Sequence, residues 1–261
     1  MKLQVLVAAV NQEVKELAQK MNLESDALIV NQCGDFDYCE YPYKDKLIRC
    51  FSMAERGVGL SRNTALMRAE GEICLFSDED IVFDSGYEKL VLSEFEKNAD
   101  ADVITFNFRV DASRRTYYNT KPGRIRWYNY GRYPTYAVAA RTEALQKRNI
   151  SFSLLFGGGA RYSNGEDSLF LHDCLKKGLH LYAATAELGE EVYRESTWFQ
   201  GYHDKFFKDR GVLYHHLYGK MAGVFSLRFL IAHRGEMLKE RGILEAYRLM
   251  RQGIVEGKSR R

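Results

Sequence analysis

Long apolar runs, proline and an excess of one charge are all scarce in this sequence of 261 residues. No stretch approaches the 18 or more apolar residues that a membrane-spanning helix needs. Only three prolines occur, which excludes a proline-rich linker or stalk. The formal charge is +3, from 38 Lys and Arg against 35 Asp and Glu. A general nucleic-acid binder has a much larger basic excess, so no nucleic-acid partner is expected.

Cysteines are also few, and their number is odd. No two of the five form a C-x-x-C motif, and they are Cys33, Cys39, Cys50, Cys74 and Cys174. This pattern favours reduced cytosolic thiols over a disulfide framework or a zinc site. The short apolar run at the N-terminus is followed by Asn11 and Glu13, where a signal peptide would have small residues. We therefore interpret that run as a buried first strand and expect a cytoplasmic protein.

Apolar runs alternate with helical patterns, which is typical of an α/β protein with a mainly parallel sheet. Strands are expected at 3–10, 27–30, 73–76, 102–108, 136–140 and 179–183, and helices at 12–22, 61–69, after 84 and at 166–177. Ser61 and Asp84 are expected to cap two of these helices. Leu90 is expected to point inward with Tyr87, Val91 and Phe95.

Three acids follow one apolar strand directly. The segment 73–80 reads ICLFSDED, so Asp78, Glu79 and Asp80 come where the strand ends. Ligands bind at this edge of open α/β sheets. Unpaired carboxylates crowded there repel one another, and a divalent cation relieves the repulsion. Oxygen ligands favour Mg²⁺ or Mn²⁺, which bind diphosphates. The alternative is a solvated acidic turn in which Asp80 or Asp84 caps a helix.

A second acidic motif stands at the start of a predicted helix. Glu166 and Asp167 follow Gly165, and a glycine run at 157–159 precedes them. The helix dipole stabilises acids in the first turn, so capping alone is one explanation. The other is a binding site, because a glycine backbone can approach a phosphate or sugar closely.

These motifs, with the segment RGVGLSRNTAL at 56–66, resemble family 2 glycosyltransferases with the GT-A fold. The resemblance rests on the order of Ser61-Arg62-Asn63, Asp78-x-Asp80 and Gly165-Glu166-Asp167, and it covers roughly residues 1–185. It implies an α/β/α sandwich with a mainly parallel sheet and a helical C-terminal extension. The domains it implies are a GT-A domain at 1–189, made of a nucleotide-sugar half at 1–108 and an acceptor half at 109–189, and an extension at 190–261.

The resemblance also implies an inverting transfer of a sugar from a nucleotide-sugar, expected to be UDP-linked, to an acceptor hydroxyl, with Mn²⁺ or Mg²⁺ as cofactor. It assigns the metal to Asp78 and Asp80, the ribose to Asp78, the uracil or ribose to Arg62, and the general base to Asp167. Where the family usually has two Asp, one of which contacts the base, this chain has Asn31 and Gln32. The acceptor-side residues are then Gly158, Gly159, Glu166 and Trp127. A C-terminal His ligand found in some relatives is not identifiable, and its candidates by residue type are His203, His215 and His216.

Two stretches have a biased composition. Residues 109–133 hold seven basic residues, one acid and six aromatic residues, namely Tyr117, Tyr118, Trp127, Tyr128, Tyr130 and Tyr133. This stretch is an acceptor loop, a surface for single-stranded nucleic acid, or an exposed excursion without a ligand. The last 28 residues carry a net +4 and have Ile243, Tyr247, Met250 and Ile254 at helical spacing. They predict a basic amphipathic helix that either packs on the domain or attracts an anionic membrane leaflet.

The function expected from these features is extension of a bacterial surface glycan (capsule, exopolysaccharide or lipopolysaccharide) on a glycan or lipid-linked glycan acceptor. The enzyme would act in the cytoplasm, peripherally at the inner face of the membrane. Two alternatives stay open. One is a haloacid-dehalogenase-type phosphatase with Asp78 as nucleophile, whose motif normally lies on the first strand of the fold, whereas two predicted strands precede Asp78 here. The other is a non-catalytic nucleic-acid or glycan binding module built on 109–133.

Overall fold

The computed structural model describes residues 1–112, 115, 117–192, 201–239 and 241–259. Its centre is a ten-stranded sheet in the order β3-β4-β2-β1-β5-β9-β7-β10-β6, with β8 paired to β10. The strands are β1 (Leu3–Val10), β2 (Asp26–Gln32), β3 (Asp37–Tyr43), β4 (Lys46–Met53), β5 (Ile73–Asp78), β6 (Ile81–Phe83), β7 (Val103–Arg109), β8 (Gly123–Ile125), β9 (Val138–Arg141) and β10 (Leu181–Glu191).

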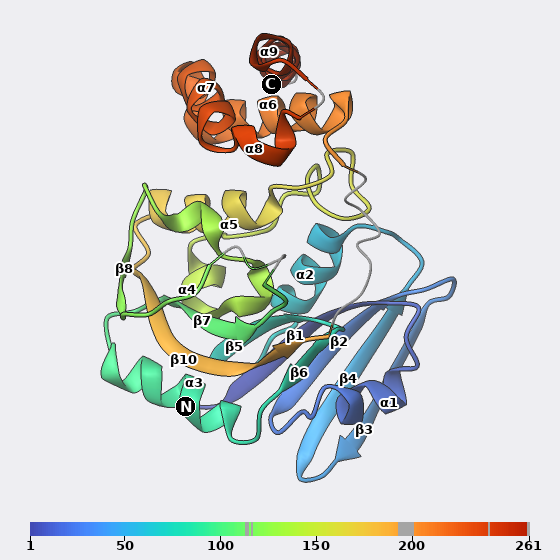
Figure 1. The fold of residues 1–261 in the computed structure, drawn as a ribbon. Helices are drawn as coiled ribbons and strands as arrows, with labels where there is room; N and C mark the ends of the chain where they lie inside the picture. The colour runs from blue at the N-terminus through green and yellow to red at the C-terminus, as the bar shows by residue number, and fades with distance from the viewer. Residues whose placement is uncertain (113–114, 116, 193–200, 240, 260–261) are drawn as a thin grey trace.

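Helices cover both faces of the sheet, and a further helical layer closes one end of the molecule (Figure 1). The α-helices are α1 (Val14–Lys20), α2 (Val58–Met67), α3 (Tyr87–Lys97), α4 (Thr142–Lys147), α5 (Glu166–Lys176), α6 (Asp204–Tyr218), α7 (Ala222–Ala232), α8 (Arg234–Met237) and α9 (Ile243–Lys258). Single 3₁₀ turns are η1 (Tyr130–Arg132), η2 (Thr135–Ala137) and η3 (Gly219–Met221). The apolar sides of α1 and α3 share one core with the sheet. Those of α2, α4 and α5 share the other core with α6, α7 and α9.

Most strands of the sheet run in one direction. β4, β2, β1 and β5 are parallel neighbours. β7 and β10 share their direction, because β9 is antiparallel to both β5 and β7. The remaining strands run the opposite way. The predicted α/β/α fold with a mainly parallel sheet and a helical C-terminal part is confirmed.

Several local predictions are wrong. Gly57, at φ 131°, is the N-cap of α2, and Ser61 lies inside the helix, where its hydroxyl donates to the Val30 carbonyl at 3.4 Å. Gly86 replaces Asp84 as the cap of α3, because the Asp84 carboxylate is bound by Arg109 at 2.6 Å instead. Leu90 is exposed on that helix rather than inward. The edge hairpin of β3 and β4 was not expected at all.

Glycines allow the two long C-terminal helices, α6 and α9, to pack closely against each other. A Cβ at Gly253 would lie 1.9 Å from the Lys208 carbonyl oxygen, and one at Gly211 would lie 2.1 Å from that of Met250. α6 and α9 therefore touch backbone to backbone. The predicted amphipathic helix is α9, and Met250 and Ile254 on its apolar side are buried. The basic residues Arg260 and Arg261 beyond it lie outside the described residues.

The biased segment at 109–133 is divided between core and surface. Tyr130 and Tyr133 are buried in the core, and Arg109 is paired with Asp84 and Glu187. Trp127 stands out to solvent, 69% exposed, with its ring 5.6 Å from that of its neighbour Tyr128. Arg114 falls outside the described residues. Part of the segment that was a candidate ligand surface is thus core packing.

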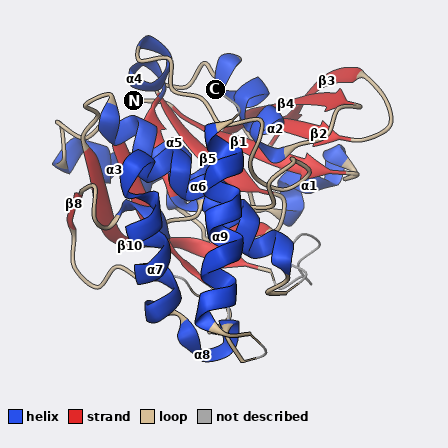
Figure 2. Ribbon diagram, turned by 90° about the horizontal axis from the view of Figure 1, so that it is seen from above, coloured by secondary structure: helices blue, strands red, loops and turns tan. Residues whose placement is uncertain are grey.

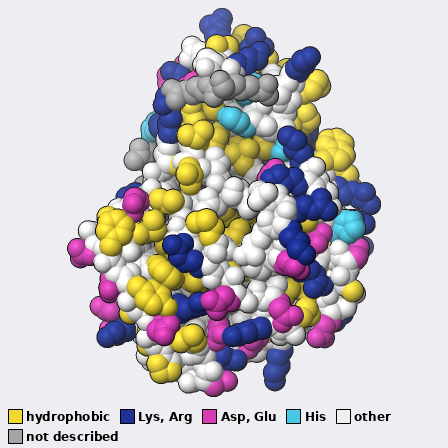
Figure 3. Space-filling model, turned by 180° about the vertical axis from the view of Figure 1, so that it is seen from behind, with side chains coloured by type: hydrophobic (Ala, Val, Ile, Leu, Met, Phe, Trp, Pro, Cys, Tyr) yellow, Lys and Arg dark blue, Asp and Glu magenta, His cyan; other side chains and the backbone are white. Residues whose placement is uncertain are grey.

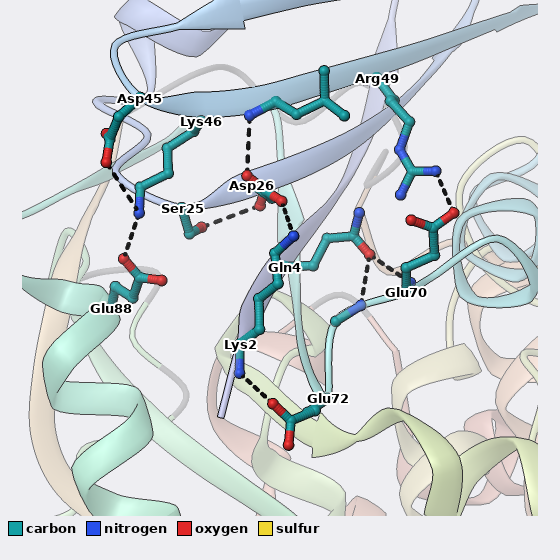
Figure 4. A network of polar contacts seen from close by, with 12 residues as sticks. Lys2, Gln4, Ser25, Asp26, Asp45, Lys46, Arg49, Glu70, Glu72 and Glu88 are labelled. Atoms are coloured by element: carbon teal, nitrogen blue, oxygen red, sulfur yellow. Dashed lines mark hydrogen bonds and ion pairs between the residues drawn. The ribbon is translucent and has the colours of Figure 1, made fainter.

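Polar side chains close the edge of the sheet where β1, β2 and β4 begin (Figure 4). The Lys2 ammonium lies 2.6 Å from the Asp26 carboxylate. The side-chain oxygen of Gln4 accepts from the backbone N–H of Glu70 at 2.8 Å. These contacts pair charged and polar side chains at the amino ends of the strands. The opposite edge is where the sheet opens into a cavity.

None of the helices in the described part of the chain combines the length and apolar character that crossing a bilayer requires.

Candidate active site

A cavity of about 860 Å³ opens at the carboxyl ends of β1 and β5. It is also lined by the end of β10, the starts of α2 and α5, the turn η2, and the loop that contains Gly158 and Gly159. Both acidic motifs predicted from the sequence reach it, through Asp78 and Asp80 on one side and Glu166 and Asp167 on the other. The sheet edge therefore brings together segments that are far apart in the chain.

Arg62 joins the two acidic motifs. Its side chain is 5% exposed. Its Nη2 donates to both carboxylate oxygens of Asp78, at 2.9 and 3.2 Å. Its Nη1 donates to Glu166 Oε1 at 3.3 Å and to Asp167 Oδ1 at 3.4 Å. One buried cation thus contacts three carboxylates and offsets part of the repulsion between them.

The Ser-Arg-Asn motif works as a unit on α2. Ser61 bonds to β2 behind the helix, and Asn63 exchanges two hydrogen bonds with the backbone of Phe152, at 2.9 and 2.7 Å. Gly59 allows the same loop to approach, since a Cβ there would lie 2.4 Å from the Ser153 oxygen. The bonds of Ser61 and Asn63 anchor the helix on both sides of Arg62 and so direct the Arg62 side chain to the carboxylates.

Burial sets the protonation of the acidic pair on α5. It raises the pKa of Glu166 to about 7, and the charge of Asp167 adds to the effect. Burial also raises the pKa of Asp167, although Arg62 and a hydrogen bond from Thr135 oppose this. The side-chain hydrogen bonds to Asp167 from Thr135 Oγ1 and from Arg62 both end on Oδ1, and the Thr135 backbone also donates to this carboxylate.

The three acids at the end of β5 have separate partners, so the expectation of crowded unpaired carboxylates is wrong. Asp78 is compensated by Arg62. Glu79 turns to β1, where its two oxygens accept from Val10 N at 2.5 Å and from Gln12 Nε2 at 3.1 Å. Glu79 therefore fixes the chain that follows β1. Asp78, Glu79 and Asp80 all line the cavity.

The donor chemistry of the cavity fits a divalent cation. Asp78, Asp80 and Glu191 all line it, and the backbone N–H of Val192 donates to the Asp80 carbonyl at 2.8 Å, which brings the end of β10 beside the motif. Carboxylate oxygens are the ligands that Mg²⁺ and Mn²⁺ prefer. Within the residues that the structure describes, no three His, Cys, Asp or Glu side chains are already arranged to hold a metal ion.

The histidines proposed by residue type as a third ligand lie elsewhere. None of His203, His215 and His216 is among the described lining residues. The ring of His216 packs 5.6 Å from that of Phe156, and His215 is buried against α9 at Gly257.

The two amides after β2 differ in position. Asn31 is buried, and its amide bonds to the backbone N–H and carbonyl of Gln12 at 3.1 and 3.0 Å, so it supports the cavity wall and does not line it. Gln32 does line the cavity. Its Nε2 donates to the carbonyls of Glu55 and Gly57. This leaves its Oε1 as the group able to meet a ligand.

The predicted acceptor-side residues are likewise divided. Gly158 and Gly159 line the cavity, and the Gly158 carbonyl accepts from Val58 N at 2.9 Å. Gly159, at φ 77°, would carry a Cβ only 3.2 Å from Gly57 N, so a glycine is needed there. Trp127 is absent from the described lining, and its role toward an acceptor stays a prediction.

The residues that line the cavity but were not predicted as site residues from the sequence include Thr135, Tyr136 and Glu191. The hydroxyl of Tyr136 donates to Glu191 Oε2 at 3.3 Å. Glu191 has the same signal as Asp78, an acid at the end of an apolar strand. It was overlooked because the predicted strand stopped at 183, whereas β10 continues to Glu191 through an irregular register.

Comparison with known proteins agrees with the resemblance to family 2 glycosyltransferases that the sequence motifs indicate. Residues 36–154, a little under half of the chain, match the family model "Glycosyl transferase family 2". A search of curated proteins gives no match. Among solved structures, S. aureus TarS 1-349 in complex with UDP-GlcNAc has a TM-score of 0.62 and 16% identity, over 89% of this chain and 72% of that one. TarS 1-349 alone gives 0.61 and 14%, over 99% and 88%.

At these identities the structural comparison establishes a shared fold, that of the GT-A glycosyltransferases. The predicted resemblance to family 2 is confirmed by the family match. Family match and fold together support a glycosyltransferase enzyme. They do not favour the phosphatase alternative, because Asp78 ends β5 instead of the first strand and both its oxygens accept from Arg62.

Proposed function

We propose that this glycosyltransferase, with its family 2 region on a GT-A fold, transfers a sugar from a UDP-sugar to an acceptor hydroxyl with inversion. One observation carries the proposal. Arg62 binds the donor-side Asp78 and the acceptor-side Asp167 at once, in a single cavity large enough for a nucleotide-sugar. The UDP donor is further supported by the fold shared with TarS, whose structure holds UDP-GlcNAc.

The chemistry follows from the positions of the carboxylates. The acceptor hydroxyl attacks the anomeric carbon while Asp167 Oδ2 takes its proton, and the bond from that carbon to the diphosphate breaks with its electrons going to the diphosphate. Because attack and departure occur on opposite faces in one step, the anomeric configuration inverts. Asp78 and Asp80 would hold Mn²⁺ or Mg²⁺, and the bound cation would neutralise charge on the departing diphosphate. Arg62 and Thr135 hold Asp167 by Oδ1 and so aim Oδ2.

We further propose a role in the biosynthesis of a bacterial surface glycan, on a glycan or lipid-linked glycan acceptor, at the cytoplasmic face of the membrane. This is supported by the family resemblance and by the net +4 of the last 28 residues. The identity of the sugar and of the linkage depends on the shape of the filled cavity.

Release of UDP tests the activity. The protein is incubated with a panel of UDP-sugars and Mn²⁺, and free UDP is measured, with p-nitrophenyl phosphate as the substrate for the phosphatase alternative. We expect UDP from at least one donor and no p-nitrophenol. Asp167→Asn keeps the shape of the base but cannot accept the proton, so it should slow release by roughly 10²–10⁴-fold. Asp45→Asn, an exposed acid far from the cavity, is the control and should leave the rate unchanged.

A further inference from the structure

An exposed apolar stripe runs along α7. Met221, Val224, Leu227 and Ile231 follow one another at helical spacing, and each is 44–60% exposed. The other side of the helix is buried through Ala222, Ser226 and Leu230. The helix contains no Asp or Glu. A surface helix normally presents polar side chains to water, so a stripe of this length indicates a contact surface.

Basic side chains border the stripe. Lys220 and Arg228 are exposed on or beside α7, and Arg248 and Arg251 are exposed on α9. α7 and α9 lie side by side at this end of the molecule (Figure 2). A Cβ at Gly223 would lie 3.5 Å from Arg251 Nη1, which places that guanidinium against α7. In the view from behind, basic and hydrophobic side chains share this end, whereas most acids lie toward the other (Figure 3).

The acids of the same helices are occupied by other partners. Glu245 and Asp204 pair with Arg241, and Glu256 pairs with Arg161. Within the described residues, none of the four basic side chains that border the stripe has an ion pair with an acid. The four described side chains that border the stripe, on and beside α7 and on α9, are therefore all basic.

An aromatic hollow of about 130 Å³ lies next to the stripe. Its lining includes Tyr214, Tyr218, Phe225, Phe229, Arg228 and His233. Tyrosine and other aromatic rings that combine an apolar body with a polar tip favour the interface between lipid chains and headgroups. An arginine at the rim can meet a phosphate with two hydrogen bonds.

We propose that this face, the apolar stripe of α7 with its basic border on α7 and α9, docks on an anionic lipid bilayer. Apolar side chains that enter the interface, bordered by cations that meet anionic headgroups, are the pattern of helices that lie on a membrane. A second copy of the chain fits less well. In a two-fold interface the patch would face itself, which sets arginine against arginine.

The docking face is tied to the acceptor side of the cavity. Ser163, a lining residue, donates from its backbone N–H and its hydroxyl to Asp209 of α6, at 2.9 and 3.1 Å. Gly165 lies so close to α6 that a Cβ would be 2.6 Å from Leu213. Docking would hold this loop near the bilayer surface, where a lipid-linked acceptor is found. This last step rests on the proposed function; the docking itself does not.

Co-sedimentation with vesicles tests the surface. The full chain is mixed with phosphatidylcholine vesicles containing none or a third of phosphatidylglycerol, at low and at high salt. We expect binding to the anionic vesicles at low salt, and a steep loss as salt screens the cations. Leu227→Glu should weaken binding by at least about tenfold, because a carboxylate replaces an inserted apolar group. Leu90→Glu, on exposed α3 across the sheet, should not.

Charge is tested with matched double variants. Arg228→Ala with Arg251→Ala should weaken binding roughly tenfold or more, since each cation at the surface contributes. Lys15→Ala with Lys89→Ala removes the same charge from α1 and α3 and should have little effect. The proposal is overturned if Leu227→Glu binds anionic vesicles as well as Leu90→Glu does, or if the two double variants bind equally well. It is also overturned if the wild type does not bind anionic vesicles.

Two further measurements separate other outcomes. Light scattering without vesicles reports self-association. If the wild type is a dimer that Leu227→Glu dissociates, the face binds a second copy of the chain, and the proposal of a bilayer contact is overturned. UDP release by Leu227→Glu should equal that of the wild type. If vesicles bind as expected while the wild type releases no UDP from any donor, the proposed function fails and the docking surface stands.

Discussion

Replacing Arg62 by methionine is the sharpest test of the buried network. Arg62→Met keeps most of the side-chain volume but removes the cation that Asp78, Glu166 and Asp167 share. Removing one partner of a buried ion pair typically costs about 3–5 kcal/mol, because the charges left behind have lost water and gained no partner. We expect the free energy of unfolding at pH 7 to fall by about that amount.

Arg109 offers a matched control, because it also contacts three carboxylates, those of Asp84, Glu187 and Glu190. That network is well exposed, at 42% for the arginine, so water and salt screen it. Arg109→Met should therefore cost at most about 1 kcal/mol. The two arginines differ chiefly in burial, so the difference between the losses in unfolding free energy of the two variants measures the effect of burial.

The cost of Arg62→Met should also depend on pH. Without the cation, the carboxyls take up protons more readily, and protonation relieves their repulsion. Urea unfolding followed by circular dichroism at pH 7 and pH 5 measures both effects. We expect a clearly smaller loss at pH 5. An equal loss at both pH values, or a loss no larger than that of Arg109→Met, would refute the buried network.

Three further predictions concern the cavity and its support. The rate of UDP release should rise with pH through the raised pKa of Asp167, since burial favours its protonated form and only the carboxylate accepts a proton; a flat pH–rate profile would contradict this. Glu166 has a pKa of about 7 in the folded chain against an ordinary 4.5, so its contribution to stability is full below pH 4.5 and is lost as pH rises toward 7. Urea titrations should show this decline in the wild type and a flatter profile in Glu166→Gln, and identical profiles would refute it. Gly253→Ala should push α9 from α6, because its Cβ would meet the Lys208 carbonyl, and lower the thermal midpoint by several degrees, whereas Gly242→Ala, with open space around it, should not.

The order of the central strands could be predicted because they form apolar runs in the sequence. β1, β2 and β5 are buried on both faces and read as continuous apolar runs. The β3–β4 hairpin could not be found this way. β3 is an edge strand with exposed charged and aromatic residues and a proline at position 42, and such a strand has no clear apolar pattern.

The N-caps of α2 and α3 were predicted wrongly, because glycines take the cap positions in place of the polar residues Ser61 and Asp84. Ser61 and Asp84 are good capping residues in isolation, but each has a tertiary partner, Val30 and Arg109 respectively. The chain instead enters α2 and α3 through Gly57 and Gly86 at positive φ. Sequence patterns do not contain these distant partners.

The members of the site could be predicted more fully than their contacts. Motif order indicated Arg62, Asp78, Asp80 and Asp167, and all four line one cavity. The ion pairs of Arg62 join residues 16, 104 and 105 positions apart, and nothing local encodes them. The same holds for Glu79, whose bond to Val10 exists only because β1 and β5 are neighbours.

Calorimetry of UDP binding tests the central claim most directly, that the cavity is a metal-assisted nucleotide-sugar site. UDP is titrated into the wild type with Mn²⁺ and with EDTA, and into Asp80→Ala and Asp45→Asn with Mn²⁺. We expect the wild type and Asp45→Asn to bind UDP in the presence of Mn²⁺. We expect binding to be lost or greatly weakened in EDTA and in Asp80→Ala, because a diphosphate beside Asp78 without a cation is repelled. UDP binding that neither EDTA nor Asp80→Ala changes would contradict the metal assignment, and no UDP binding by the wild type would contradict the claim as a whole.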